Sequence, residues 1–493
     1  MPTTNIQENQ NSWLPARVAF MMLLFVGVAG YSVSLSLDHG WAAGVLVGLC
    51  MIPSVIMLQP MVTRRNMDFF QPTAFVLLNL ILGVSLRSIL IISNTTDPDI
   101  QRLFLLDEEL SFFIPAAFWI ILSMCLFLVG YNINTGTLRS RIGFLNRGIE
   151  SWKPDRVLFL SVILLSISAY SIYDFITQLS ITDITGGSFS KKRILRVDGE
   201  KVALGYQRWG ASLGELCFYM LLIFKLLRRK SFFSAHGVLL VISGSIAILF
   251  PVFTSSKISV VFVGFNVLML YSYIRDIPSK RFLPYGLVLM VLIVVMSRSR
   301  TARDASVTDL VSGISVTETF GALIQNRNQL GITKTAHIMD AVPNRMEFAY
   351  GSTMIGWIWA PIPKTWWKEK PVVLTGPTVT EKVYGLNWKY NGGVPPGLVA
   401  DLYWNFGYAG ILIGYFVVGF LTRRMYDFFS ILRRKPNALL LYIGLLYSLV
   451  FVLHSNGVVY AITTFLQSIV PALLVIIFLT LPRIQFAWPK ELR

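Results

Sequence analysis

About twelve apolar runs, each close to the length needed to cross a bilayer, constrain the fold of this chain more than any other feature. A membrane-spanning helix needs roughly 20 apolar residues. In lipid, only helices and closed barrels satisfy their own backbone hydrogen bonds. We therefore predict an all-α polytopic membrane protein. The predicted transmembrane helices are residues 17–37, 41–59, 72–93, 111–132, 157–178, 208–227, 235–253, 257–274, 282–298, 396–421, 438–454 and 459–481.

The composition agrees with a membrane protein. Of the 493 residues, 54% are hydrophobic and only 14% are charged, and the mean hydropathy is +0.61. These values exclude an ordinary soluble domain. The three cysteines lie inside apolar runs, which argues against a disulfide framework or a zinc site. Residues 1–13 are polar and lack the basic stretch and cleavage site of a signal peptide, so we expect the first helix to be retained.

Lys and Arg gather in alternate loops between the predicted helices. Because cytoplasmic loops carry the excess of Lys and Arg in membrane proteins, these loops and both termini are predicted to be cytoplasmic. The basic loops contain Arg64, Arg65, Arg139, Arg141, Arg147, Lys153, Lys225, Arg228, Arg229, Lys230, Arg275, Lys280, Arg281, Arg423, Arg424, Arg433, Arg434 and Lys435.

The longest polar interruption, residues 298–395, divides the chain into three parts. Predicted helices 1–9 occupy residues 1–297, and residues 396–493 contain helices 10–12 and a cytoplasmic tail. The interruption is predicted to be a large outer loop between helices 9 and 10, with a surface helix or a helix that caps the site within 304–330. We expect any chemistry in this loop, which is rich in Trp and Pro.

Two outer segments break the charge rule. Residues 178–208 hold six Lys or Arg against three Asp or Glu, and residues 298–393 hold eleven against seven. Long loops escape the topological rule, so one interpretation is solvent-facing charge without a role. The other is an electropositive outer face that collects an anionic substrate.

The sequence contains neither a nucleotide-binding signature nor a metal-ligand cluster. A site on the outer face would have no ATP or nucleotide sugar, so its donor must arrive already activated, and a lipid pyrophosphate is the obvious form. Arg87, inside the third predicted helix, is costly in lipid and is a candidate to bind it. The alternatives are that Arg87 reaches the outer interface, or that it pairs with Glu215 of the sixth helix.

Two passages carry a family resemblance. The first passage is Gly393-Val-Pro395-Pro396-Gly-Leu-Val-Ala-Asp401-Leu-Tyr403-Trp404-Asn405-Phe406-Gly407-Tyr-Ala-Gly410. The second, upstream, is Glu347-Phe-Ala-Tyr350-Gly351 with the segment from Pro361 to Pro371. Both resemble motifs of O-antigen polymerases, the oligosaccharide repeat unit polymerase (Wzy) family. Lys364 stands where Arg is usual in that family, and Asp401 where Glu is common. Both keep the charge, although Lys loses the bidentate fork of Arg.

The resemblance implies a metal-independent glycosyltransferase with a GT-C-like fold in the bacterial inner membrane, with its active site facing the periplasm and without a cofactor. It would transfer a growing glycan from undecaprenyl pyrophosphate to the non-reducing end of another undecaprenyl-pyrophosphate-linked repeat unit. The implied partners are this lipid-linked oligosaccharide, as donor and acceptor, membrane lipids and a chain-length-regulating membrane protein, with no nucleic acid.

Candidate site residues follow from that chemistry. A carboxylate or His takes the acceptor proton, and cations offset charge on the departing pyrophosphate. The candidate bases are Glu347, Asp401 and His337. The pyrophosphate candidates are Arg345, Arg300, Arg303, Arg327, Lys364, Arg193, Arg196 and Arg87. The glycan-binding candidates are Tyr350, Trp366, Trp367, Tyr403, Trp404 and Asn405. For the charges the alternative is an ordinary loop charge or salt bridge, and for the Trp residues it is an aromatic belt at headgroup level.

Two other functions remain open at this point. An O-antigen ligase would attach the glycan to a lipid A core, and composition does not separate it from a polymerase. A polyprenyl-linked oligosaccharide transporter would place functional charges in the middle of the membrane across many helices. In the sequence only Arg87 and Glu215 meet that description.

Overall fold

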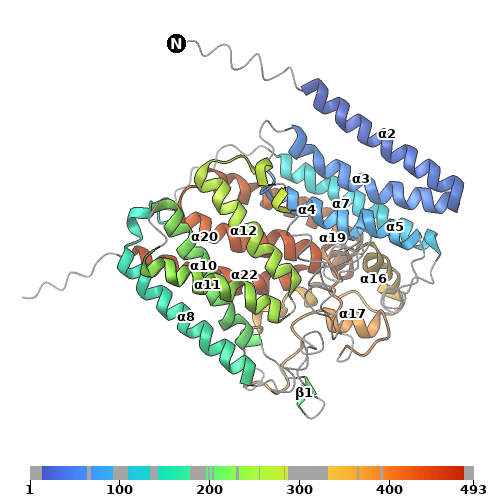
Figure 1. The fold of residues 1–493 in the computed structure, drawn as a ribbon. Coiled ribbons are helices and arrows are strands. Elements are labelled where there is room, and N and C mark those ends of the chain that lie inside the picture. Colours follow the sequence, from blue (N-terminus) through green and yellow to red (C-terminus); the bar gives the residue numbers. More distant parts are fainter. Residues whose placement is uncertain are drawn as a thin grey trace, which may run out of the picture.

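The protein is described here from a computed structural model, which is almost entirely helical (Figure 1). Within the described residues, the only strands are β1 (Arg196–Val197) and β2 (Glu200–Lys201), which form a two-residue antiparallel hairpin. The described residues are 14–63, 68–92, 109–133, 143–177, 196–197, 200–201, 205–228, 233–254, 256–282, 284–286, 331–362, 366–388 and 392–481.

Eleven helices in these ranges are long and apolar enough to cross a membrane. The prediction of a polytopic helical membrane protein is thereby confirmed. The eleven are α2 (Leu14–His39), α3 (Trp41–Thr63), α4–η1–α5 (Pro72–Leu80, Ile81–Ser85, Leu86–Ile92), η2–α7 (Leu110–Phe113, Ile114–Asn132), α8 (Pro154–Thr177), α10 (Gly205–Arg228), α11 (Ala235–Phe253), α12 (Lys257–Arg275), α19 (Leu398–Ile431), α20–η8–α21 (Pro436–Leu445, Leu446–Val452, Leu453–Asn456) and α22 (Val458–Thr480).

The predicted helix bounds can be compared with these. Ten of the eleven helices start and end within a few residues of the predicted bounds. The exception, α19, continues to Ile431 instead of ending at 421, so Arg423 and Arg424 lie within a helix and not in a loop. The predicted ninth helix, 282–298, lies almost wholly outside the described residues, as does the surface helix expected within 304–330.

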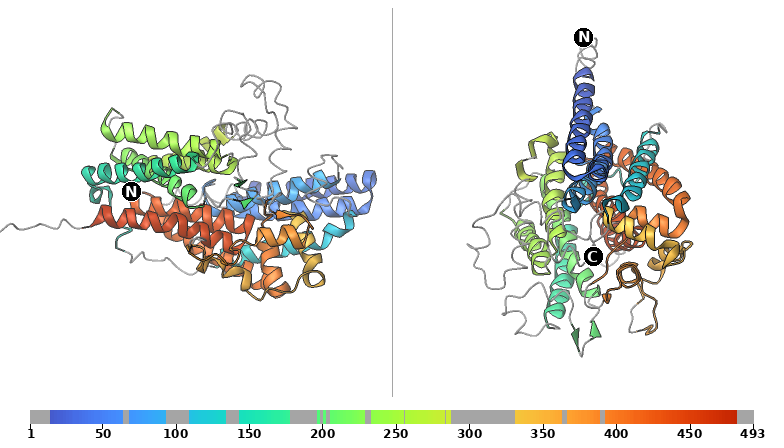
Figure 2. Two further views of the ribbon diagram at one scale, coloured as in Figure 1. Left: turned by 90° about the horizontal axis from the view of Figure 1, so that it is seen from below. Right: turned by 90° about the vertical axis from the view of Figure 1, so that its right-hand side faces the viewer.

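The central pair of helices is α7 and α19, whose backbones approach closely. A Cβ atom at Gly130 would lie 2.1 Å from the carbonyl oxygen of Phe416, and one at Gly419 would lie 2.0 Å from that of Phe127. Only glycine permits such an approach, and small residues commonly mediate helix packing in membranes. At the edge of the bundle α2 packs against α3, as Figure 1 and Figure 2 show.

Four shorter helices belong to the polar segment that precedes α19. They are α16 (Ile332–Asn344), η6 (Ser352–Met354), η7 (Gly356–Ile358) and α17 (Gly376–Lys382). The first of them, α16, does not lie in a surface loop: it packs against α7, η2 and α19. The polar segment therefore enters the bundle at one end.

The bundle has two ends that are easily distinguished. The helix from Pro72 to Ile92 has Asp68 just before its first residue and Arg87 near its last turn. We call the end of the bundle that contains Asp68 the Asp68 end. There Asp276 also pairs with Arg433 and Arg434. The other is the α16 end, where α16 meets the start of α19 and the junction of α21 with α22. The charge bias of the loops predicts that the Asp68 end faces the cytoplasm.

Candidate functional site

The helix α16 carries two residues of the candidate site, Lys334 and His337, and most of its side chains are buried. Its regular turns end at Val342, which has non-helical φ and ψ because the residue before a proline is disfavoured in the α conformation. The buried residues are Ile332, Thr333, Lys334, Thr335, Ala336, His337, Ile338, Ala341 and Val342. A lysine and a histidine are thus enclosed with apolar neighbours.

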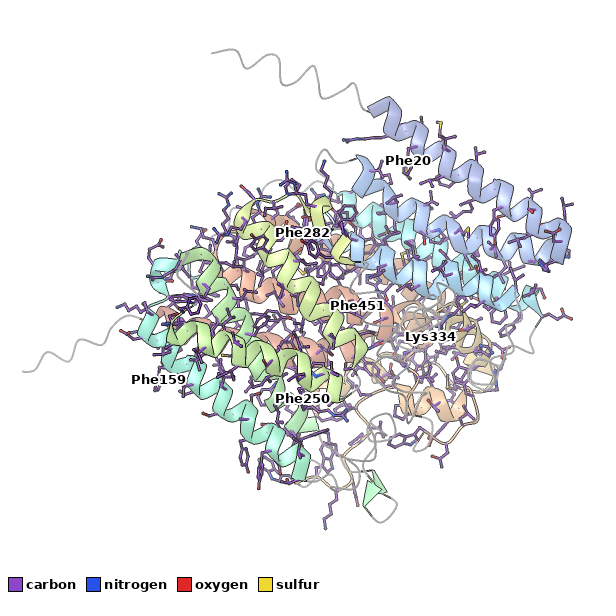
Figure 3. The ribbon with its side chains drawn as sticks, in the orientation of Figure 1. Phe20, Phe159, Phe250, Phe282, Lys334 and Phe451 are labelled. Atoms are coloured by element: carbon purple, nitrogen blue, oxygen red, sulfur yellow. The ribbon has the colours of Figure 1, made fainter. Side chains whose placement is uncertain are left out.

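Lys334 has only 1% of its surface exposed, and its Nζ donates a hydrogen bond to the carbonyl oxygen of Ser455 at 2.8 Å. That carbonyl is available because α21 ends at Asn456, and the last carbonyls of a helix lack helical donors. Burial lowers the pKa of Lys334 well below its usual value, and the neighbouring Arg87 lowers it further. The protein thus bears a cost for placing an amine here (Figure 3).

Arg87 of α5 reaches the same buried region and is 4% exposed. A Cβ atom at Gly331 would lie 3.2 Å from Nη1 of Arg87, so the glycine before α16 leaves room for the guanidinium. Two basic side chains from distant parts of the sequence therefore share one interior site, and the Arg87 side chain lies within the protein instead of at an exposed helix end. Glu215 instead lines a cavity between other helices, where its Oε1 accepts a hydrogen bond from Tyr219 at 2.8 Å.

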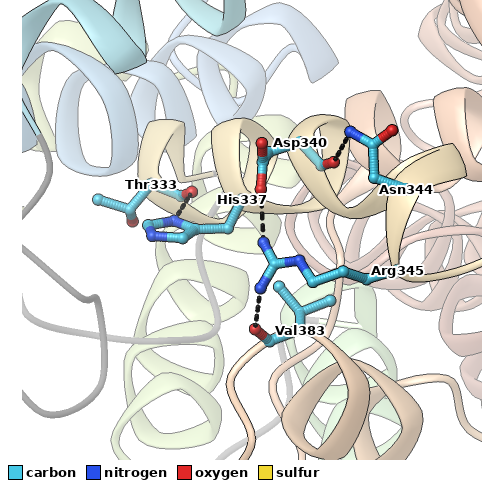
Figure 4. Close-up of polar contacts among 6 residues, drawn as sticks. All are labelled: Thr333, His337, Asp340, Asn344, Arg345 and Val383. Atoms are coloured by element: carbon cyan, nitrogen blue, oxygen red, sulfur yellow. Dashed lines mark hydrogen bonds and ion pairs between the residues drawn. The ribbon is translucent and has the colours of Figure 1, made fainter.

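His337 lies one turn beyond Lys334 on α16. Its Nδ1 is 2.7 Å from the carbonyl oxygen of Thr333 (Figure 4). Because a carbonyl only accepts, Nδ1 carries the hydrogen, and Nε2 is the nitrogen that can take up a proton. The centroid of the His337 ring lies 5.2 Å from that of the Phe112 ring and 5.5 Å from that of the Tyr384 ring. His337 therefore has a defined tautomer in a closed aromatic environment.

Asp401 fixes the start of α22. Its side chain is buried, and Oδ2 accepts a hydrogen bond from the backbone N–H of Val458 at 2.7 Å. A carboxylate is favourable at a helix N-terminus. A Cβ atom at Gly457 would lie 2.6 Å from the same oxygen, so the junction of α21 with α22 needs a glycine there. Asp401 thus positions the turn that follows the carbonyl partner of Lys334.

Asn405, Tyr403 and Trp404 attach the polar segment to α19. The Asn405 Oδ1 accepts hydrogen bonds from the N–H of Gly351 and from the hydroxyl of Thr353, each at 2.9 Å. The Tyr403 hydroxyl donates to the carbonyl oxygen of Val342 at 3.2 Å, and Trp404 Nε1 donates to that of Glu347 at 3.2 Å. These three side chains are buried beneath the segment, where they fix its path.

Other predicted residues are exposed on the protein surface. Arg345 Nη2 lies 2.5 Å from Asp340 Oδ2, and its Nη1 donates to the carbonyl oxygen of Val383 at 3.3 Å (Figure 4). Glu347 is exposed, and Tyr350 and Trp366 are about four-fifths exposed, at 80% and 83%. Trp367 is 40% exposed. The structure thus separates buried cations on α16 and α5 from charged and aromatic side chains on the surface.

Several predicted residues cannot be placed. Arg300, Arg303, Arg327, Lys364 and Arg193 lie outside the described residues. Arg196 is in β1, where only the backbone is described. Across the described ranges, no three His, Cys, Asp or Glu side chains come together as a metal site would require.

Two residues of the site were not among the predicted ones. Lys334 is the first, and its position two residues after an apolar Ile332 gave no signal of burial. His454 is the second: it is fully buried, with ring centroids 5.6 Å from Phe127 and 5.7 Å from Tyr415. In the part of the chain that the structure describes, neither ring nitrogen of His454 has a hydrogen-bond partner. A buried polar group of this kind needs a specific explanation, such as a water or a ligand.

Comparison with known proteins adds no relative. No known family model matches the sequence, and no curated protein or solved structure matches it.

Proposed function

We propose that this chain is a polysaccharide polymerase that uses a lipid-pyrophosphate-linked glycan as donor and a second lipid-linked repeat unit as acceptor. The observation that carries the proposal is the juxtaposition of Lys334 and Arg87, buried at the end of the bundle where the polar segment enters. Placing two like charges together in an interior is unfavourable. A site built this way favours a ligand of high negative charge, and a pyrophosphate at headgroup depth has that charge.

The reaction can be written with these groups. The acceptor hydroxyl oxygen attacks the anomeric carbon of the donor sugar, and the bond from that carbon to the pyrophosphate oxygen breaks. The electron pair leaves with undecaprenyl pyrophosphate, whose developing charge Lys334 and Arg87 would stabilise. The acceptor proton passes to a base, for which Nε2 of His337 and the exposed carboxylate of Glu347 are the two candidates.

Exposed aromatic side chains of the polar segment support a glycan ligand. Tyr350, Trp366 and Trp367 expose large rings beside charged side chains, and such rings can stack on the apolar faces of sugars. The motif residues Asp401 and Asn405 would contribute by holding α22 and the 351–353 turn in place and not by contacting substrate. In this proposal the α16 end, which the loop charges predict to be non-cytoplasmic, faces the periplasm of a bacterial inner membrane.

The test uses the purified chain in nanodiscs with lipid-linked repeat units. We expect a ladder of longer lipid-linked glycans, separated by gel electrophoresis. Arg87→Met should reduce the rate about 10²–10³-fold by removing a transition-state interaction. Arg434→Met is the matched control, because Arg434 lies at the Asp68 end in an exposed pair with Asp276. An active Arg87→Met variant, or no product from the wild-type chain, would reject the proposal.

The same assay distinguishes the two alternatives. Addition of lipid A core as a second acceptor identifies a ligase if the glycan is transferred to that core and no ladder forms. A transporter instead makes the lipid-linked glycan accessible on the other side of a vesicle without lengthening it. The buried ionisable groups Lys334, Arg87 and Asp401, with the half-buried Glu215, justify including this second arm.

A further inference from the structure

A cavity with both polar and apolar walls lies away from Lys334, between α10, α11 and α12. Its volume is about 190 Å³. At roughly 30 Å³ for each water molecule, it has room for about six, less than the ~300 Å³ at which drug-sized pockets begin. The cavity is at the α16 end, because Tyr206 in the first turn of α10 donates a hydrogen bond to the carbonyl oxygen of Pro361 at 2.6 Å. Its size suits one small ring and not an oligosaccharide.

The polar wall of the cavity is one face of α10. Arg208, Ser212 and Glu215 line it at positions i, i+4 and i+7, which share a helix face. The opposite face of α10 is fixed against α8: a Cβ atom at Gly210 would lie 2.0 Å from Ser171 Oγ, and one at Gly214 would lie 2.7 Å from Ser168 Oγ. This close packing sets the rotation of α10, and the polar face is therefore held toward the cavity.

The carboxylate of Glu215 is oriented before any ligand binds. Asn266 Nδ2 donates to the Tyr219 hydroxyl oxygen at 3.0 Å, and that hydroxyl donates to Glu215 Oε1 at 2.8 Å. An ionised carboxylate can accept about four hydrogen bonds. The Tyr219 hydroxyl donates only one of these hydrogen bonds, so the Glu215 carboxylate can accept further hydrogen bonds from a ligand.

The other hydroxyl groups also present acceptors. The Ser212 hydroxyl donates to the carbonyl oxygen of Trp209 at 2.6 Å, and the Thr254 hydroxyl donates to that of Phe250 at 3.1 Å. Ser256 and Ser259 share one hydrogen bond of 2.7 Å. Their hydrogens are largely used within the protein while their oxygen lone pairs remain. The ligand that fits must bring several hydrogen-bond donors.

The facing wall, from α11, is apolar. Ile246, Phe250 and Pro251 line it (Phe250 is labelled in Figure 3). Pro251 has no N–H, so the carbonyl of Ala247 loses its usual helical donor and is one more acceptor beside the cavity. A ligand between the two walls therefore needs one apolar face and a rim of donors. A sugar ring has both, with C–H groups on its faces and hydroxyls around its edge.

The geometry points to this cavity as a binding site for a single sugar residue. We assign that sugar as the terminal residue of the glycan that accepts the growing chain, and this assignment of its source rests on the proposed function. Glu215 and Arg208 bind the hydroxyls of the ring, and Phe250 contacts its face. Binding of a sugar ring is testable without any glycosyl transfer.

The binding test uses the full chain in nanodiscs and a panel of methyl glycosides, including hexosides, 6-deoxyhexosides and N-acetylhexosaminides. Saturation-transfer difference NMR should detect at least one of them. Ala247→Leu and Ser212→Leu fill the cavity from two helices and should abolish the signal. Ser245→Leu is the control, because Ser245 is exposed on α11 and its hydroxyl bonds back to Val241. Glu215→Gln should weaken binding about tenfold to a hundredfold.

The outcomes separate this inference from the proposed function. No glycoside signal from the wild-type chain, or an unchanged signal from both filled variants, overturns the cavity as a sugar site. If a filled variant fails to fold, Glu215→Gln decides, since the amide keeps the hydrogen bond with Tyr219. A wild-type chain that binds a glycoside but makes no polymer refutes the polymerase proposal and leaves the sugar site standing. Polymer made equally by wild-type and filled variants refutes the acceptor assignment alone.

Discussion

At the Asp68 end a half-buried carboxylate is surrounded by donors, whereas at the α16 end two buried basic side chains lie together. Asp68 Oδ2 accepts hydrogen bonds from the hydroxyls of Tyr273 at 2.9 Å and Tyr426 at 3.2 Å, and Oδ1 accepts from the N–H of Phe70 at 2.9 Å. Burial raises the pKa of Asp68, and these hydrogen bonds offset part of that shift. Lys334, by contrast, donates to a carbonyl and lies near Arg87, which further lowers its pKa.

This difference indicates a structural role for Asp68 and favours the proposed functional role for Lys334 and Arg87. The donors around Asp68 come from α12, from α19 and from the loop before α4, so this carboxylate ties three elements together. The Lys334 amine also links α16 to the end of α21, but burying it beside Arg87 is unfavourable. Local features that contradict good folding are commonly functional sites. We therefore expect variants at the two ends to affect different quantities.

Lys334→Met should have the largest effect, and on activity alone. Removing the amine takes away a transition-state interaction, and we expect a loss of about 10²–10³-fold in polymerisation rate. Stability should stay the same or increase, because a similar apolar side chain replaces a buried charge. The measurements are the rate in nanodiscs and the thermal unfolding temperature. A less stable but fully active Lys334→Met variant would show that the lysine is structural and would remove the contrast.

Asp68→Ala should show the opposite behaviour. It leaves two tyrosine hydroxyls and the Phe70 N–H without their acceptor, which should cost about 2–4 kcal/mol of stability. The rate per folded molecule should remain near that of the wild type. Thermal unfolding and a rate normalised to folded protein measure the two quantities. Loss of activity in well-folded Asp68→Ala protein would mean that the Asp68 end also takes part in function.

The membrane helices were predictable because one physical requirement, an apolar run of bilayer length, dominates each of them. The burial of α16 was not predictable from the sequence. Pattern rules treat lysine as exposed, and Lys334 becomes buried only through contacts with α5 and with the end of α21, which are distant in sequence. The place of the Arg87 side chain likewise depends on Gly331, about 240 residues away.

The motif residues show a second limit. Asp401 and Asn405 were identified from the sequence, yet the structure shows both bonded to the backbone of neighbouring segments. A motif that starts a helix and fixes a turn has the same polar residues as one that contacts substrate. The motif at the start of α19 therefore does not distinguish positioning residues from residues that would react.

The pH dependence of stability should also differ between Lys334 and its variant. In the folded state the pKa of Lys334 is well below its usual value, so the folded protein binds fewer protons than the unfolded chain from that lowered pKa up to about 10.4. The free energy of unfolding should therefore rise with pH across this window in the wild type, relative to Lys334→Met. Thermal unfolding at a series of pH values measures it.

Inorganic pyrophosphate provides the control for this pH prediction. An anion beside Lys334 favours the protonated amine and should reduce the difference in slope between the two proteins. Parallel curves for the wild type and Lys334→Met, with and without pyrophosphate, would contradict both the lowered pKa and the anion site.

Arg345→Ala should have the smallest effect, and it compares an exposed cation with the buried ones. The side chains of Arg345 and Asp340 are 47% and 45% exposed, and such a pair contributes under about 1 kcal/mol. We expect less than a tenfold loss of rate, and the same small change in Asp340→Asn, since each variant breaks the same ion pair. The sequence predicted a larger role, in which Arg345 offsets charge on the departing pyrophosphate. A loss above a hundredfold in Arg345→Ala, with Asp340→Asn unaffected and partial recovery in Arg345→Lys, would establish that role. The pyrophosphate would then lie at the surface beside α16, and the buried cations would need another explanation.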